Sequence, residues 1–278
     1  MKIMTLKEIQ KVNLELMSDI HEFCVQNCID YSLAYGSLIG AVRHNGFIPW
    51  DDDIDIMMTR PNFERFSKEY VSKRGFILSS VYDKNTYINY TRVYDNRTIV
   101  VSPAKQSSNK VGIWVDVFPI DAIPDDQEAA DDQFRRLRQY TLLVMKWRYL
   151  MSSVTKADIR SKLYGIKELV KLIYANKSTF AQWHKYIISI CKENNFGLTK
   201  YCSSLVCVEA NIKNRQEVFF TKDFQDYELC DFEEYQFFIL KSSDSILKTI
   251  FGEYMIMPPK EKQVSHVLKK WKFYWKNI

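Results

Sequence analysis

Short apolar runs alternate with turn residues through residues 30–120, whereas residues 125–257 contain no proline. The runs are rich in β-branched and aromatic residues and are bounded by glycine, proline or polar clusters, a pattern that predicts strands. We expect strands at Ser32–Tyr35, Ile54–Met58, Phe76–Tyr82, Tyr87–Tyr94, Thr98–Ser102 and Val111–Phe118, and a return to strand within 217–240.

Helical signals occupy much of the remaining sequence. Thr5 and Glu8 have the spacing of a capping box, and apolar residues follow them at helical intervals. Further helices are expected at Leu38–His44, at Pro61–Lys73, through most of 125–215 and at Ser242–Phe251. This order predicts an α+β fold, with a mixed β-sheet core, flanking helices and a helical C-terminal portion.

The proline and glycine positions divide the chain into three parts. We expect a core with its N-terminal helix at 1–124, a mainly helical portion packed on that core at 125–259, and a basic aromatic tail at 260–278. The tail holds six lysines and one glutamate, a charge of +5 that equals the charge of the whole chain. The neutral body is unlike a nucleic-acid coat, and we expect no nucleic-acid partner.

Composition excludes several classes of protein. With 278 residues, 46% of them hydrophobic and 26% charged, the chain can bury a sizeable core, so it is not a disordered chain, a collagen or a small disulfide scaffold. It has neither a run of about 18 apolar residues nor a signal-peptide pattern, which predicts a cytoplasmic protein with six reduced cysteines. His21, Cys24 and Cys28 share a predicted helix face; a core role is favoured over a zinc site because no CxxC pair exists.

An acidic cluster carries the clearest chemical signal. Asp51, Asp52, Asp53 and Asp55 lead directly into a predicted strand. Side chains two residues apart in a strand share a face, so Asp53 and Asp55 point together while the isoleucines between them enter the core. Convergent carboxylates suit a hard divalent cation such as Mg²⁺. The alternative, a solvated acidic turn, does not account for the apolar alternation that follows.

Phosphate-binding candidates lie on either side of this cluster. Gly36 and Ser37 follow a predicted strand and precede a short helix, an arrangement whose backbone N–H groups can bind an anion. Arg43 can bind a phosphate with two N–H groups, and Arg92 is a second candidate. Both arginines have an alternative interpretation as ordinary surface cations.

A third acid interrupts a later apolar run. Asp116 lies between two valines in a strongly strand-like segment, where an aspartate is costly unless it is paired or bound to metal. We interpret Asp116 as a third carboxylate of the site, either a metal ligand or a general base. Asp121 comes two residues after Pro119 and is assigned to a turn.

Together these segments resemble the LicD family, which is related to the fukutin group. The matching pieces are Gly36-Ser-Leu-Ile-Gly-Ala-Val-Arg43, Gly46-Phe-Ile-Pro-Trp-Asp-Asp-Asp-Ile-Asp55, Trp114-Val-Asp-Val-Phe-Pro119 and, less closely, Phe251-Gly-Glu-Tyr-Met-Ile-Met-Pro-Pro259 with His266 beyond. The late piece departs from the family pattern by having Phe251 where a tyrosine is usual. The resemblance implies a nucleotidyltransferase-like fold: a small mixed sheet flanked by helices.

The resemblance also implies an activity. It is the transfer of a phospho-alcohol group from a CDP-activated donor, such as CDP-choline, to a hydroxyl of a cell-surface glycan, with release of CMP. Carried over residue by residue, Gly36 and Ser37 bind phosphate, Asp53 and Asp55 bind Mg²⁺ (or Mn²⁺), and Asp116 is the third acid. Asp51 lies on the same alternation and is a further candidate for the metal shell.

Two other functions fit the same residues. The first is transfer of a nucleotidyl group from an NTP to a sugar or small molecule, which the acid cluster does not distinguish from the main hypothesis. The second is a non-catalytic binding or scaffold protein, which the complete set of acids disfavours.

The tail also allows two interpretations. Lysines interleaved with Trp271, Phe273, Tyr274 and Trp275 suit peripheral contact with the inner face of a membrane, where a lipid-linked glycan acceptor would lie. The alternative is a C-terminal helix whose aromatic residues pack on the body.

Overall fold

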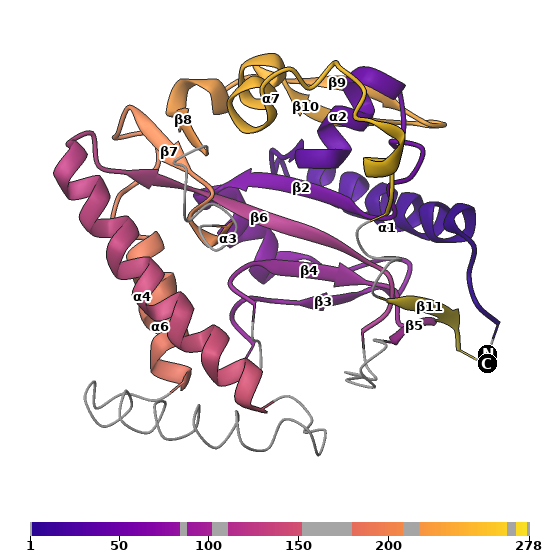
Figure 1. Cartoon of the computed structure of the whole chain (residues 1–278), viewed down its shortest axis with the longest axis horizontal. Helices are drawn as coiled ribbons and strands as arrows, with labels where there is room; N and C mark the ends of the chain where they lie inside the picture. Colours follow the sequence, from indigo (N-terminus) through magenta and orange to yellow (C-terminus); the bar gives the residue numbers. More distant parts are fainter. Residues whose placement is uncertain are drawn as a thin grey trace.

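In the computed structural model, described here for residues 2–83, 88–101, 111–151, 180–207, 217–265 and 271–276, a curled mixed sheet lies at the centre of the molecule (Figure 1). Its strands follow the order β1-β2-β6-β4-β3. They are β1 (Ser32–Leu33), β2 (Ile54–Thr59), β6 (Trp114–Ile123), β4 (Thr91–Tyr94) and β3 (Ile77–Ser79). β2 and β6 are parallel, and the other neighbours are antiparallel. The fold is therefore α+β, as predicted.

Helices cover this sheet, and the first begins as the sequence predicts. The Thr5 hydroxyl accepts a hydrogen bond from the Glu8 N–H, and the Glu8 carboxylate accepts one from the Thr5 N–H, which completes a capping box. The helices are α1 (Leu6–Gln26), α2 (Tyr35–His44), α3 (Arg60–Glu69), α4 (Gln127–Met151), α6 (Phe180–Cys191) and α7 (Ser243–Phe251). Short 3₁₀ turns lie at η2 (Leu205–Cys207), η3 (Thr221–Phe224) and η4 (Lys260–Lys262).

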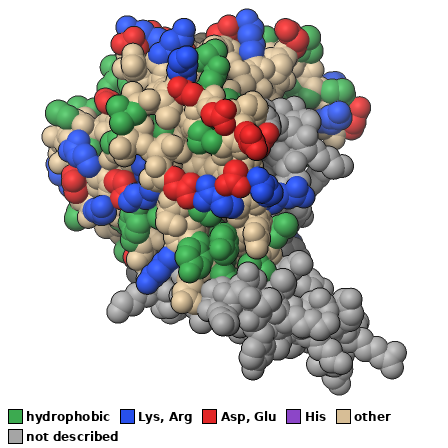
Figure 2. All heavy atoms as spheres, turned by 90° about the vertical axis from the view of Figure 1, so that its left-hand side faces the viewer, with side chains coloured by type: hydrophobic (Ala, Val, Ile, Leu, Met, Phe, Trp, Pro, Cys, Tyr) green, Lys and Arg blue, Asp and Glu red, His purple; other side chains and the backbone are tan. Residues whose placement is uncertain are grey.

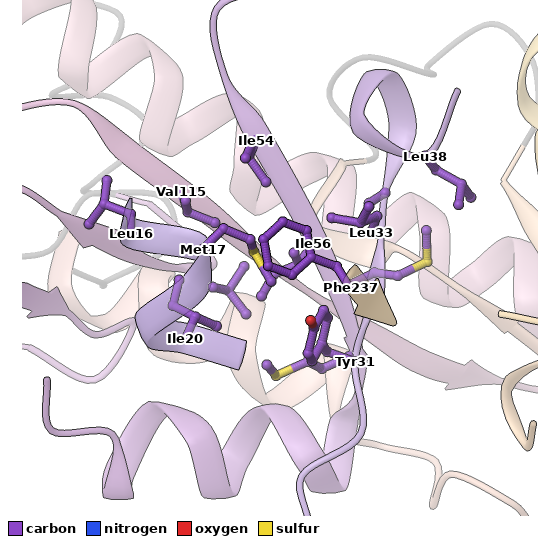
Figure 3. Packing of buried hydrophobic residues seen from close by; sticks show 14 of the residues in the cluster. Leu16, Met17, Ile20, Tyr31, Leu33, Leu38, Ile54, Ile56, Val115 and Phe237 are labelled. Atoms are coloured by element: carbon purple, nitrogen blue, oxygen red, sulfur yellow. The ribbon is translucent and has the colours of Figure 1, made fainter. Parts of the chain in front are cut away.

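The main core lies between α1 and the sheet (Figure 3). Leu16 and Ile20 of α1 pack toward Ile54 and Ile56 of β2, all four fully buried. The alternation after the acidic cluster therefore points its apolar residues inward, as predicted. Phe237 reaches the same core from a hairpin formed by β9 (Tyr227–Phe232) and β10 (Tyr235–Leu240).

A second apolar cluster forms where α4 and α6 pack beside β6, with Trp183 fully buried. β6 is long enough to pair also with β7 (Tyr201–Ser203), which pairs with β8 (Val218–Phe220). Phe219 and Phe232 from the later chain share the main core with α1 and β2. The division of the chain at 124 and 259 stays a prediction.

Two predictions about local structure were wrong. Asp121 is not in a turn but inside β6, fully buried. β6 continues through Pro119, although proline has no N–H group to donate. The proline is tolerated because β6 has a partner strand on only one side at this position: β4 pairs with residues 114–117 and β7 with 121–123. α2 begins at Tyr35, three residues before the predicted start.

Where the structure describes residues 271–276, the tail does not form the C-terminal helix that was one of its two interpretations. Residues 272–275 form β11 (Lys272–Trp275), which pairs antiparallel with β5 (Thr98–Val101), and Phe273 is buried. The aromatic packing expected of the tail is present, but in a strand rather than a helix. Figure 1 shows the two chain ends side by side, and Ile3 forms a β-bridge with Tyr274. Tyr87, Ser102 and His266 lie outside the described residues.

Among the described residues, no helix combines the length and apolarity needed to cross a bilayer. The face in Figure 2 presents lysine, arginine, aspartate and glutamate side chains interspersed, with no large area of one charge. All six cysteines are free thiols, and Cys24 is a buried core residue.

Candidate active site

Three consecutive aspartates lie between a turn closed by the Asp51 N–H and Ile48 carbonyl and the start of β2. Oxygen atoms of Asp51, Asp52 and Asp53 all lie within 4.8 Å of one another. Helix α1 holds this turn by its backbone, because Gln10 Nε2 donates to the Asp51 carbonyl and Asn13 Nδ2 to the Asp52 carbonyl, both at 2.9 Å. The acidic residues thus have a fixed position beside the sheet rather than forming a loose solvated turn.

Asp55 and Asp116 meet on neighbouring strands. They are register partners on the parallel strands β2 and β6, and Arg92 of β4 is the register partner of Asp116 on the other side. The Arg92 guanidinium donates to both oxygens of Asp116, at 2.6 and 3.1 Å, and Trp114 Nε1 donates to Oδ2 at 3.1 Å. A carboxylate offers about four acceptor sites. Three donors therefore leave room for about one more partner.

Electrostatics in this cluster are dominated by crowded negative charge. Burial raises the pKa of Asp53 and Asp55 well above the ordinary value, and repulsion from neighbouring carboxylates raises both further. Arg92 opposes this shift at Asp55. The donor set consists of hard carboxylate oxygens with excess negative charge. This set fits Mg²⁺ or Mn²⁺.

The start of α2 lies against the acids. A Cβ atom at Gly36 would lie only 2.7 Å from Asp51 Oδ2. Glycine at this position therefore permits the close approach of α2 to the Asp51 side chain. The Ser37 hydroxyl accepts a hydrogen bond of 2.9 Å from the Asp55 N–H, which ties α2 to β2. The N-terminus of α2 has no side-chain cap, so its first N–H groups provide the positive end of a helix dipole beside the acids.

Tyr35, which opens α2, adds a feature that the sequence did not reveal. Its φ of 48° lies in the left-handed region, which is unusual for a bulky residue and is typical of functional sites. Its hydroxyl donates to Glu217 at 3.2 Å, and its ring packs edge-on against Phe118 at 5.5 Å. These contacts hold the turn that presents Gly36 and Ser37.

The two candidate arginines have different environments. Arg92 belongs to the acid cluster, as its pairing with Asp116 shows. Arg43, at the other end of α2, hydrogen-bonds His44 and the carbonyl of Tyr254. Among the described contacts, Arg43 reaches none of the aspartates. His21, the proposed partner of Cys24 and Cys28 in a zinc site, instead contacts the Tyr31 hydroxyl at 2.8 Å.

Three contacts of the site were not predicted from the sequence. Asp52 accepts a hydrogen bond of 2.6 Å from the Ser265 hydroxyl, 213 residues away in the chain. Trp114 serves Asp116 as a donor and also lies beneath Arg92, whose guanidinium carbon is 4.2 Å from the ring centroid. The tryptophan two residues before Asp116 was a usable signal, since side chains at that spacing in a strand share a face. Nothing local pointed to Ser265.

This fold and this site define an α+β protein with a strand-borne aspartate cluster beside a helix N-terminus. The family whose profile matches residues 28–148 is described as "LicD/FKTN/FKRP, nucleotidyltransferase domain". The lipopolysaccharide cholinephosphotransferase LicD of Haemophilus influenzae is 28% identical over 275 residues, which cover 97% of this chain and 98% of that protein.

Shorter matches fall on uncharacterized proteins of Rickettsia prowazekii and Rickettsia typhi, each 55% identical over 42 residues. These cover 15% of this chain and 16% and 14% of the rickettsial proteins. The family profile over residues 28–148 and the match along nearly the whole chain both agree with the LicD-like motifs of the sequence.

Proposed function

We propose that this protein transfers a phospho-alcohol group, with phosphocholine as the first candidate, from a CDP-activated donor to a hydroxyl of a cell-surface glycan. The observation that carries the proposal is the aspartate cluster of β2 and β6 beside the uncapped start of α2. Similarity to a lipopolysaccharide cholinephosphotransferase along nearly the whole chain supports the choice of transferred group and acceptor. We further propose that the sheet and its helices have a nucleotidyltransferase-like arrangement.

The acids of the site would hold a divalent cation. Asp53 and Asp55, with Asp51, are the proposed ligands, and Asp52 lies within the same group of oxygens as Asp51 and Asp53. Asp116 is the alternative further ligand if it does not serve as the general base. When bound, Mg²⁺ or Mn²⁺ supplies positive charge to the donor diphosphate and to the departing CMP.

The remaining residues would bind and orient the substrates. The N–H groups of Gly36 and Ser37 at the uncapped start of α2 would bind a phosphate of the donor, and Arg92 adds positive charge next to the acids. Arg43 stays a candidate for donor binding farther along α2. Asp116 has about one acceptor site remaining, which suits it to take the proton of the acceptor hydroxyl.

The transfer step is a substitution at the phosphorus that carries the alcohol. The acceptor oxygen forms a new bond to that phosphorus, and the bond to the bridging oxygen of the diphosphate breaks. CMP leaves with that oxygen and its electron pair, while the hydroxyl proton passes to Asp116. Positioning and charge neutralisation are expected to supply most of the rate enhancement.

We also propose a cytoplasmic location with peripheral contact at the inner face of the membrane through 260–278. Phe273 is buried, so membrane contact would depend on the exposed Lys260, Lys262 and Lys272. Liposome flotation in low and high salt tests this, because contact through lysines should be lost in high salt. Equal flotation with neutral and anionic vesicles would contradict it.

Product analysis tests the main proposal. The purified protein is incubated with Mg²⁺, a glycan acceptor and either CDP-choline or CTP, and CMP and pyrophosphate are both measured. Release of CMP from CDP-choline, dependent on acceptor and abolished by EDTA, is the expected result. Pyrophosphate from CTP would instead indicate a nucleotidyltransferase, and a panel of CDP-alcohols identifies the transferred group. No product with any donor would support a binding protein.

A further inference from the structure

The C-terminal segment contacts the candidate active site at two points. The Ser265 hydroxyl donates to Asp52 Oδ2 at 2.6 Å, and the ring of Phe273 lies 6.0 Å from that of Trp114 at an angle of 42°. We propose that Ser265 and Phe273 are positioning residues, which hold the acid turn and the Arg92–Asp116 pair in place. The assignment rests on the proposed function for its catalytic consequence.

The contact between Phe273 and Trp114 matters to the site because Trp114 touches both Asp116 and Arg92. Its indole N–H donates to Asp116, while its ring face lies 4.2 Å from the Arg92 guanidinium carbon. One side chain therefore contacts both members of the ion pair. A shift of the Trp114 ring would change the direction of its hydrogen bond to Asp116 and remove the surface on which Arg92 lies.

Phe273 is itself firmly held. It is 3% exposed, it is the register partner of Val100 on β5, and its carbonyl accepts a hydrogen bond of 2.9 Å from the Met4 N–H. The strand β11 thus joins the N-terminal segment and β5, and it places a rigid ring against Trp114. Because side chains alternate along a strand, Phe273 and Tyr274 point to opposite faces of β11.

The two contacts converge on one small hollow. Its lining consists of Asp52, Asp53, Ile113, Trp114 and Phe273. Asp53 is a proposed metal ligand, Asp52 is held by Ser265, and Trp114 is held by Phe273. The C-terminal segment therefore forms part of the wall beside the acids, although Ser265 is 213 residues from Asp52 in the sequence.

Two substitutions test these roles, each with a matched control. Phe273→Leu keeps an apolar side chain in β11 but removes the ring, and Tyr274→Leu makes the same change on the opposite face. Ser265→Ala removes the hydroxyl, and Ser245→Ala does so at an exposed position on α7. Ser265→Thr restores a hydroxyl and should rescue the loss.

The first measurement is hydrogen–deuterium exchange of the metal-free protein. We expect Phe273→Leu to increase exchange several-fold in peptides covering 112–118, and Ser265→Ala to do so in 51–56. The β9–β10 hairpin and both control variants should exchange as in the wild type. Unchanged exchange at the site, or an equal increase throughout the molecule, would overturn the positioning roles.

The second measurement separates kcat from KM with the donor that the product analysis selects. Misplaced acids should lower kcat about tenfold or more and change the KM for the donor less, since the substrate-binding groups of α2 are untouched. A kcat within twofold of the wild type in both variants would overturn the catalytic consequence. If the wild type itself has no activity but local exchange increases as expected, the proposed function fails and the positioning contacts stand.

Discussion

Asp55 and Asp116 occupy the same register position on two parallel strands, so the sheet brings two carboxylates together at its centre. Neighbouring strands are about 4.8 Å apart, and side chains at matched positions share a face. Arg92 pairs with Asp116 but only partly offsets the negative charge around Asp55. The site therefore carries an electrostatic cost in the metal-free protein that a bound cation would remove.

This cost predicts opposite effects of one substitution on stability and activity. Asp55→Asn removes a buried charge, so the melting temperature of the metal-free protein at pH 7.5 should rise by a few degrees. Turnover should fall about 100-fold or more, because a proposed ligand of the cation that neutralises the donor's charge is lost. Differential scanning fluorimetry and CMP release measure the two effects. Asp226→Asn, at an exposed position, should change neither. Retained turnover in Asp55→Asn would contradict the assigned site.

Two glycines of α2 should respond differently to alanine. A Cβ at Gly40 would lie 2.4 Å from the backbone carbonyl oxygen of Gly46, so the turn after α2 must move. Gly40→Ala should therefore lower the free energy of unfolding by about 1–3 kcal/mol. A Cβ at Gly36 meets only the end of the Asp51 side chain, which can rotate away. Gly36→Ala should keep near wild-type stability but bind Mn²⁺ more weakly. Urea unfolding and Mn²⁺ titration make the comparison, and equal stability losses in both variants would contradict it.

The buried Arg60–Asp121 pair should dominate local stability on the far side of the sheet. Arg60 donates to both oxygens of Asp121 at 2.6 and 2.9 Å, and Asp121 is fully buried. Asp121→Asn removes the close counter-charge of a buried guanidinium, leaving only the Glu64 carboxylate at 3.6 Å, and should cost about 3–5 kcal/mol in urea unfolding. Glu193→Gln breaks the comparable but exposed pair with Arg136 and should cost less than about 1 kcal/mol. Similar costs for the two variants would show that burial does not control the effect.

His21 should make stability depend on pH. Burial lowers its pKa from the ordinary 6.5, with the nearby Glu22 opposing this shift, so the folded state favours the neutral ring that contacts Tyr31. Below pH 6.5 the unfolded chain therefore binds more protons than the folded one at this position, and the free energy of unfolding falls as pH falls toward the lowered pKa. Urea unfolding between pH 7.5 and 5 should show a smaller decline in His21→Gln than in the wild type. Parallel curves would exclude this contribution.

Local patterns in the sequence by themselves determined much of the site. Ile54 and Ile56 alternate with Asp53 and Asp55, and strand geometry alone places the two pairs on opposite faces. The capping box at Thr5 and the strands on either side of the acids follow from equally short-range signals. Such features are predictable because neighbours within a few residues decide them.

Only the tertiary structure decided which partners these residues have. The sequence left Arg92 open to interpretation as a surface cation, and the sheet order, which places β4 beside β6, decides against this. The sequence assigned Asp121 to a turn, but β6 extends past Pro119 and includes it. Ser265 and Phe273 reach the acids from the other end of the chain. The periodicity of a sequence specifies which face a side chain occupies, but strand order and register specify what lies opposite it, and these depend on packing across the whole molecule.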